Sequence, residues 1–111
     1  QFGKPITEFQ AVSHKLADMA IMTETARHLI YRAATVVREH TKESMKLATM
    51  AKCYGTDVAM SVASQAVDIL GGYGYSEEYP VERMMRDAKG LQLFEGTNQI
   101  QRNAIARTIL T

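Results

Sequence analysis

The stretch "FQAVSHKLADMAIMTETARHLIYRAATVV", residues 9–37, decides the fold class of this chain. Apolar and small side chains recur along it in alternating steps of three and four residues, the spacing that gathers them on one side of an α-helix. This spacing is followed by Phe9, Val12, Leu16, Met19, Thr23, Ala26, Ile30, Ala33 and Val37, of which Thr23 alone is polar. We predict a first helix over residues 7–40, about 50 Å long at about 1.5 Å per residue. Such a length exceeds that of the average globular helix and favours a bundle.

The rest of the chain predicts three more helices and no strand. Small side chains line one broad face between residues 42 and 70, so this second helix should be central and closely packed, ending at the Gly71-Gly72 pair. After a glycine-rich connector, Pro80 suits the first turn of a short third helix. No segment alternates apolar and polar side chains with the period of two that is typical of a half-buried strand. The sequence predicts one all-α domain, residues 1–111, folded as an up-and-down four-helix bundle with helices over residues 7–40, 42–70, 80–89 and 97–110.

Composition excludes several classes of function. The 111 residues are 46% hydrophobic, which is enough for the core of one domain. The 13 basic and 12 acidic residues are spread along the chain and leave a net charge of +1, so we expect no nucleic-acid surface and no anionic-membrane surface. No apolar run approaches the ~18 residues that a membrane span needs, so no span is expected.

The single cysteine, Cys53, lies within the second predicted helix, so no disulfide can form inside the chain. This usage is typical of a reducing compartment, here the cytoplasm or the mitochondrial matrix, and the thiol is expected to be buried and inert. The chain begins with "QFGKPI" rather than with Met, which suggests a processed or excised piece of something longer.

Two patterns suggest ligand sites but lack the necessary context. The "GGYG" at residues 71–74 is similar to the glycine-rich turn of a dinucleotide-binding domain, but that turn follows a strand, whereas here a long helix precedes it. A helix stop is the better interpretation. His14, His28 and His40 all fall on the first predicted helix without a second group of ligands, so no metal site is predicted.

The stretch "LQLFEGTNQIQ", residues 91–101, places Glu95 between Phe94 and Gly96, just before the fourth predicted helix. A carboxylate there is stabilised by the partial positive charge of the helix start, and spacing alone favours this structural role. A general base aimed at a substrate is the other interpretation. Gly96 removes the neighbouring side chain and would let a ligand come close to the carboxylate, while Thr97 adds a hydroxyl.

Three stretches, "QFGKPITEFQ", "DILGGYGYSEEYPVERMMRDAK" and "LFEGTNQIQRNAIAR", together resemble the C-terminal domain of the flavin-dependent acyl-CoA dehydrogenases. They occur in the family's order and spacing, and the resemblance covers essentially the whole chain. It implies a four-helix bundle that completes a site for FAD and acyl-CoA together with an N-terminal helical domain and a middle β-domain. Both of those domains are expected to lie outside this chain, so the isolated bundle should be inactive.

The resemblance also implies roles for individual residues. Glu95 would take the α-proton of the acyl-CoA thioester while the β-hydride passes to the flavin, and its backbone amide would help to hold the thioester carbonyl. Phe94 would border the acyl chain, with Gly96 beside it. The positions that correspond to FAD contacts are Thr97 and Gln99 and, toward the FAD of a neighbouring subunit, Gln1, Phe2, Gly71 and Gly72. These last contacts imply a homo-oligomer, either a dimer or a tetramer, and the family's usual electron acceptor is an electron-transfer flavoprotein.

The chain departs from the family pattern at Asp68, where a glutamine commonly meets the flavin pyrophosphate. A carboxylate facing a pyrophosphate is unfavourable, so that contact is not transferred to Asp68. Two alternatives stay open from the sequence. An acyl-CoA oxidase would share the fold and differ in reoxidising its flavin with oxygen, and an isolated bundle could serve only as a non-catalytic oligomerisation or scaffold module.

Overall fold

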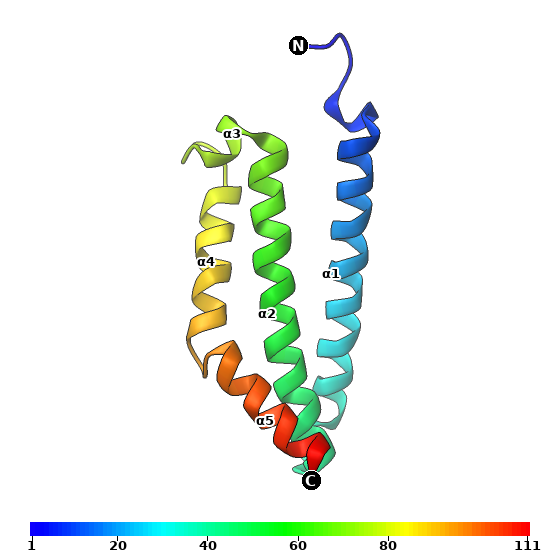
Figure 1. Ribbon diagram of the computed structural model, residues 1–111, viewed down its shortest axis with the longest axis vertical. Coiled ribbons are helices and arrows are strands. Elements are labelled where there is room, and N and C mark those ends of the chain that lie inside the picture. Colours follow the sequence, from blue (N-terminus) through cyan, green and yellow to red (C-terminus); the bar gives the residue numbers. More distant parts are fainter.

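The computed structural model describes all 111 residues, and they form helices and turns without any strand (Figure 1). The elements are η1 (Ile6–Glu8), α1 (Gln10–Val36), η2 (Val37–Glu39), α2 (Lys42–Leu70), α3 (Gly72–Tyr75), α4 (Val81–Leu93) and α5 (Asn98–Leu110). Four of these helices are long and no strand is present, so the predicted all-α class is confirmed. The molecule is elongated, with its longest extent 57 Å, because the two longest helices lie side by side.

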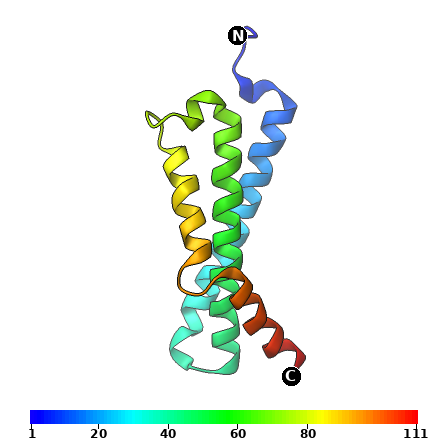
Figure 2. The same cartoon turned by 60° about the vertical axis from the view of Figure 1, so that its left-hand side comes forward.

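The central element is α2, which packs against α1, α4, α5 and α3, whereas α1 and α4 lie on either side of it (Figures 1 and 2). Its small side chains permit this close packing. A Cβ built on Gly55 would lie only 3.1 Å from Cδ1 of Ile30 on α1, so the two helices approach too closely there for an ordinary side chain without a shift. The predicted central position of this helix is therefore correct.

The last helix takes a different course from the up-and-down arrangement expected for it. Helices α1, α2 and α4 alternate in direction, but α5 continues in the general direction of α4 and crosses α2 obliquely (Figures 1 and 2). The side chain of Asn98, the first residue of α5, is hydrogen-bonded to residues 53, 56 and 57 of α2, which ties the start of α5 to that helix. The connection therefore sets α5 across α2 rather than back along α4.

The predicted first helix, residues 7–40, consists of three helical pieces. Phe9 is extended, with φ −86° and ψ 127°, and separates the short η1 from α1. At the other end η2 is followed by His40, which has a left-handed backbone with φ 51°. Thr41 then caps the start of α2: its hydroxyl accepts from Ser44 N at 3.0 Å, and Ser44 Oγ accepts from Thr41 N at 2.9 Å. This reciprocal cap fixes where the second helix starts.

Two boundaries near α4 also differ from prediction. The connector after α2 contains the one-turn helix α3, which lies so close to α2 that a Cβ on Gly74 would be 2.7 Å from the Val67 carbonyl oxygen. Helix α4 runs to Leu93 rather than to about residue 89, because Gly90 continues the helix instead of ending it. The later end brings α4 directly up to Phe94 and Glu95.

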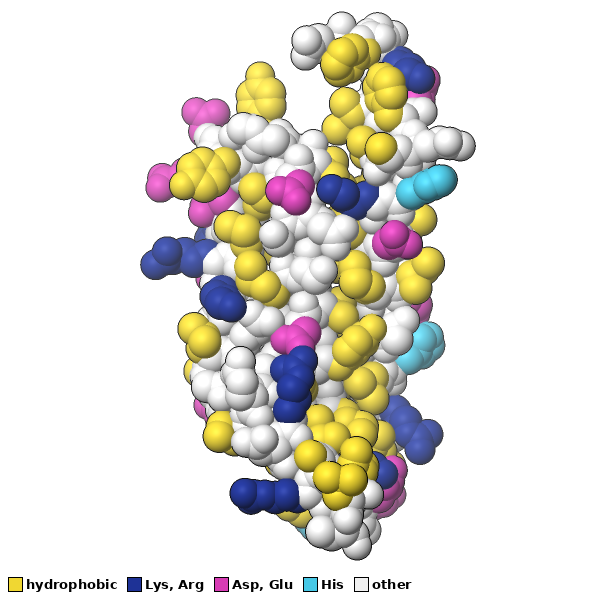
Figure 3. Space-filling model, viewed as in Figure 1, with side chains coloured by type: hydrophobic (Ala, Val, Ile, Leu, Met, Phe, Trp, Pro, Cys, Tyr) yellow, Lys and Arg dark blue, Asp and Glu magenta, His cyan; other side chains and the backbone are white.

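The core is thin for a chain of this length. Only 10 of the 111 residues are buried, and they are Ala26, Ala33, Ser44, Leu47, Ala51, Cys53, Val58, Gly74, Ala88 and Asn98. An apolar groove of about 650 Å³ runs between α1 and α4 over the small side chains of α2. Figure 3 shows further hydrophobic side chains at the surface along the seam between α1 and α2. No helix of the chain has both the length and the apolar composition that crossing a membrane requires.

Candidate functional site

The turn between α4 and α5, residues 94–97, has an unusual backbone. Its first residue, Phe94, is extended, with φ −90° and ψ 170°, and its N–H donates to the Gly90 carbonyl oxygen at 3.1 Å. Glu95 and Gly96 then both have positive φ, 56° and 85°. A left-handed conformation costs a residue with a side chain roughly 1–2 kcal/mol, so contacts around Glu95 must stabilise it. The Glu95 side chain itself is exposed.

Two features of the turn favour glycine at position 96. Its φ of 85° is rare for residues with a side chain, and a Cβ built there would lie 2.7 Å from Gln101 Nε2. That amide nitrogen is already engaged, because it donates to the Glu95 carbonyl oxygen at 3.0 Å. The space that a larger residue would occupy therefore holds a hydrogen bond that fixes Glu95.

Helix α5 is capped by Thr97, whose hydroxyl accepts from Ile100 N at 3.3 Å. The next residue, Asn98, is only 3% exposed, and its side-chain amide faces α2. Its nitrogen donates to Cys53 O at 3.2 Å, to Thr56 Oγ1 at 2.8 Å and to Asp57 Oδ1 at 2.7 Å. Lys52 Nζ lies 2.7 Å from Asn98 Oδ1, so both ends of the buried amide are paired.

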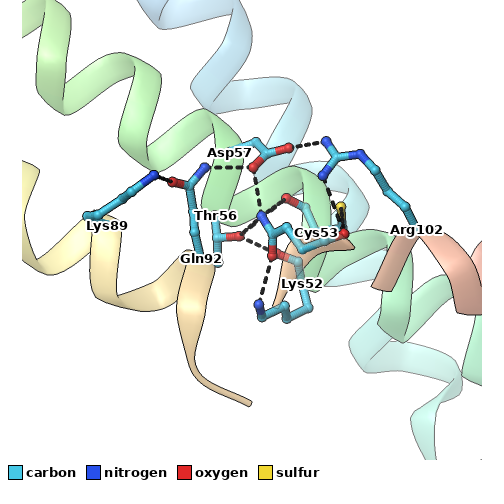
Figure 4. A network of polar contacts seen from close by, with 8 residues as sticks. Lys52, Cys53, Thr56, Asp57, Lys89, Gln92 and Arg102 are labelled. Carbon is cyan, nitrogen blue, oxygen red and sulfur yellow. Dashed lines mark hydrogen bonds and ion pairs between the residues drawn. The ribbon is translucent and has the colours of Figure 1, made fainter. Parts of the chain in front are cut away.

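Asp57 on α2 joins α4 and α5 to the central helix (Figure 4). Its carboxylate accepts from Gln92 Nε2 of α4 and from Asn98 Nδ2 of α5, each at 2.7 Å, and it pairs with the Arg102 guanidinium. Burial alone would raise the pKa of Asp57, but hydrogen bonds from Arg102, Asn98 and Gln92 outweigh it and hold that pKa below its usual value. Asp57 is therefore ionised at neutral pH and serves as an anchor.

Cys53 lies beside this network, with Sγ 3.8 Å from the Asn98 carbonyl oxygen. The thiol is buried, as predicted, and burial raises its pKa, so it is protonated at neutral pH and a poor nucleophile. No group of three or more histidine, cysteine, aspartate or glutamate side chains is placed to hold a metal ion. His28 instead lies near Glu24, with Nε2 3.2 Å from the carboxylate, on the exposed side of α1.

The structure divides the predicted site residues into two groups. The turn between α4 and α5 holds Phe94, Glu95, Gly96, Thr97 and Gln99 together. The opposite end of α4 holds Gly71 and Gly72, and the chain's N-terminus with Gln1 and Phe2 lies toward that same end (Figure 1). The 13 residues of α4 separate the two ends by about 20 Å. One copy of this chain does not bring both groups to one point.

Both groups leave open space or polar atoms that a ligand could contact. A Cβ built on Gly71 or Gly72 would meet nothing within 4 Å, so the space beside these glycines is open to a ligand or to a neighbouring chain. At the other end Thr97 uses its oxygen as an acceptor, which leaves its O–H free to donate, and the Gln99 amide is exposed. Asp68 is also exposed near the two glycines.

The residues that support the turn were not predicted from the sequence, and they are Lys52, Asp57, Gln92, Asn98 and Arg102. One signal was present, because Lys52 and Asp57 are charged residues in a run of α2 that is otherwise small or apolar. A charge on the packing face of a helix indicates a buried or half-buried partner. Which partner it would meet depended on the oblique course of α5, and helical periodicity does not contain that information.

The chain is thus a helical domain in which the turn between α4 and α5 is held by hydrogen bonds and carries the exposed carboxylate of Glu95. The profile of the acyl-CoA dehydrogenase C-terminal domain matches residues 1–110. The chain belongs to this family.

Individual relatives agree with this assignment. The chain is 51% identical over 109 residues to cyclohexane-1-carbonyl-CoA dehydrogenase of Geobacter metallireducens, a match that covers 98% of this chain and 28% of the relative. It superimposes with a TM-score of 0.94 and 50% identity on butyryl-CoA dehydrogenase from Megasphaera elsdenii, covering 100% of this chain and 29% of that one. A chain in a structure of the electron transferring flavoprotein of Acidaminococcus fermentans matches with a TM-score of 0.93 and 50% identity, over 99% of this chain and 29% of that one. The chain thus spans less than a third of the length of these relatives.

Proposed function

We propose that this chain is the C-terminal domain of a longer FAD-dependent acyl-CoA dehydrogenase, and that Glu95 is the base of its α,β-dehydrogenation. The observation that carries the proposal is the setting of Glu95. Its side chain is exposed, while its backbone is held in a left-handed turn by contacts from α5 and, through Gly96, from α2. A carboxylate that only began a helix would need no such support.

In the proposed reaction Glu95 removes the α-proton of the acyl-CoA thioester. Negative charge that develops on the thioester oxygen is stabilised by hydrogen-bond donors, among them the Glu95 backbone amide. Phe94, which is 55% exposed in this chain, lies beside Glu95 and supplies an apolar surface for the acyl chain. Thr97 and Gln99 would help to hold FAD, which would supply the acceptor for the hydride that leaves the β-carbon, so that the product is the α,β-unsaturated thioester.

The cofactor residues are proposed to act on two different FAD molecules. Thr97 and Gln99 would contact the FAD of their own subunit, whereas Gln1, Phe2, Gly71 and Gly72 would contact that of a neighbour. The separation of about 20 Å along α4 supports this division. Exposed apolar side chains and the groove of about 650 Å³ support the presence of further protein around the domain, as in a dimer or a tetramer.

The substrate class is an acyl-CoA thioester, and the relatives' names indicate how widely the acyl group varies. One of them acts on cyclohexane-1-carbonyl-CoA and another on butyryl-CoA, at nearly equal identity to this chain. An electron-transfer flavoprotein is the proposed electron acceptor, which separates a dehydrogenase from an oxidase of the same fold. Flavin absorbance in the purified full-length protein distinguishes both enzymes from a non-catalytic scaffold, which would be colourless.

The proposal is tested by Glu95→Gln in the full-length protein, with butyryl-CoA and cyclohexane-1-carbonyl-CoA as substrates and a dye as electron acceptor. The variant should keep its FAD and lose dehydrogenation by about 10²- to 10⁴-fold, because the amide cannot accept the α-proton. Glu39→Gln is the matched control, since Glu39 is exposed, makes no ion pair and belongs to η2 at the far end of α1. Turnover by Glu95→Gln at the rate of this control would exclude Glu95 as the base.

A further inference from the structure

Lys52 directs its charge at the turn that carries Glu95. Its Nζ lies 2.7 Å from the Gly96 carbonyl oxygen and 2.7 Å from Asn98 Oδ1. The three ion pairs of the chain involve Arg27, Lys46 and Arg102, and His28 contacts Glu24, whereas Lys52 contacts no carboxylate. The ammonium group of Lys52 is therefore paired with two neutral oxygen atoms, one from the turn before α5 and one from the first residue of α5.

These contacts complete the support of two consecutive peptide groups. The Glu95 carbonyl oxygen accepts from Gln101 of α5, and the Gly96 carbonyl oxygen accepts from Lys52 of α2. Both residues have positive φ, and this backbone conformation sets the direction of the two carbonyl groups. The conformation is unfavourable for Glu95, which has a side chain. Without the contact from Lys52, the Gly96 carbonyl oxygen would lose its hydrogen bond to α2, and of these two carbonyl groups only that of Glu95 would stay fixed, by Gln101 of α5.

The position of Lys52 in the fold allows it to hold the turn in place. It belongs to the central helix, its side chain is half-buried, and the preceding residue, Ala51, is in the core. Hydrogen bonds from a charged donor are roughly twice as strong as those between neutral groups. The same ammonium group also fixes Asn98, the buried first residue of α5, so it couples the turn to the helix that follows.

We infer that Lys52 is a positioning residue for proton abstraction: through the Gly96 carbonyl it holds the turn that aims the Glu95 carboxylate. The inference rests on the proposed function of Glu95. We assign Lys52 no contact with substrate or cofactor. Its loss should slow the step that needs an accurate base and should leave the binding of acyl-CoA and FAD largely unchanged, since a misplacement of about 1 Å can cost about 10²-fold in rate.

The test compares Lys52→Met with Lys46→Met in the full-length enzyme. Lys46 also lies on α2 and is partly buried, but it pairs with Glu43 and not with the turn. Flavin bleaching is followed after anaerobic mixing with butyryl-CoA and with butyryl-CoA deuterated at the α-carbon. For Lys52→Met we expect bleaching about 10- to 100-fold slower, a KM close to wild type and a larger α-deuterium isotope effect. Lys46→Met should match the wild type in all three.

Lys52→Arg is the conservative variant and should recover part of the lost rate, because its guanidinium can donate to both oxygen atoms. If Lys52→Met loses FAD or melts early, Lys52→Gln decides, since its neutral amide retains one donor group. A folded Lys52→Gln enzyme that bleaches at the wild-type rate overturns the inference, as does Lys52→Met with unchanged rate and isotope effect. Glu95→Gln, measured in parallel, separates the two proposals. An active Glu95→Gln enzyme would exclude Glu95 as the base. An inactive Glu95→Gln enzyme together with an unaffected Lys52→Met enzyme would exclude only the positioning role of Lys52.

Discussion

Asn98 Nδ2 lies 2.7 Å from Asp57 Oδ1, and this hydrogen bond joins the start of α5 to the middle of α2 across 41 positions of sequence. The two residues are of different kinds. Asn98 is almost completely buried, whereas Asp57 is half-buried and paired with Arg102 at the surface. Together they determine where α5 begins, and the turn that carries Glu95 lies immediately before that point.

Replacing Asn98 by alanine should destabilise the domain. The change removes an amide that pairs with Cys53 O, Thr56 Oγ1 and Asp57 Oδ1, and it leaves these α2 groups without that partner. The expected loss is about 1–3 kcal/mol in the free energy of unfolding, measured by urea denaturation of the full-length protein. Asn103→Ala, at an exposed position of the same helix, is the control and should change stability by less than about 0.5 kcal/mol. Equal effects of the two changes would show that the buried network contributes nothing.

Asp57 should make stability depend on acid pH. Its pKa is lower in the folded protein than its usual value of 3.8, so the unfolded chain binds more protons in the range just below that value. The stability that Asp57 contributes is therefore present above about pH 4 and is lost as the pH falls through the folded-state pKa. Asp57→Asn should be less stable than the wild type at neutral pH, and the difference should shrink in acid.

The measurement for Asp57 is a series of urea denaturations of wild type and Asp57→Asn from neutral pH down to about pH 3. Asp18→Asn, at an exposed position of α1 without an ion pair, serves as the control. A stability difference for Asp57→Asn that stays constant over this range would contradict the assignment of Asp57 as an ionised anchor.

Two glycines near the turn should respond to alanine in opposite directions. Gly90 lies inside α4, where a new Cβ would be 3.7 Å from the Phe94 ring, an ordinary contact, so Gly90→Ala should stabilise by about 0.5–1 kcal/mol. Gly96→Ala meets Gln101 Nε2 at 2.7 Å and has an unfavourable φ, so it should destabilise by roughly 1 kcal/mol or more. Thermal unfolding of the two variants checks this pair, and a stabilised Gly96→Ala protein would refute the described turn.

The sequence predicted the helices well and their spatial arrangement less well. The periodicity from Phe9 to Val37 and the small residues of α2 contain enough information for the all-α class and for the central helix, because both follow from side-chain spacing along one element. The end of α4 was placed too early because Gly90 was followed by no helix-stopping conformation until Phe94. The course of α5 depends on Asn98 meeting Asp57 of a distant segment, which spacing along either helix does not reveal.

The candidate site shows the same division. The local pattern around Glu95 identified the residues of the turn, and the structure places them together. Lys52 and Asn98 were missed because their roles come from contacts 44 and 46 positions apart in the sequence. The positive φ of Glu95 was likewise not predictable, since glutamate has no preference for that conformation.

The role of Glu95 as the base is tested most directly by the first turnover of the full-length Glu95→Gln enzyme. The rate of a single turnover does not depend on product release or on the electron acceptor. The enzyme is mixed anaerobically with butyryl-CoA, and the absorbance of the oxidised flavin is followed in time. We predict that acyl-CoA still binds and perturbs the flavin spectrum, while bleaching is slower than in the wild type by about 10²- to 10⁴-fold or more. Bleaching at the wild-type rate would contradict the account, because the α-proton would then leave without Glu95.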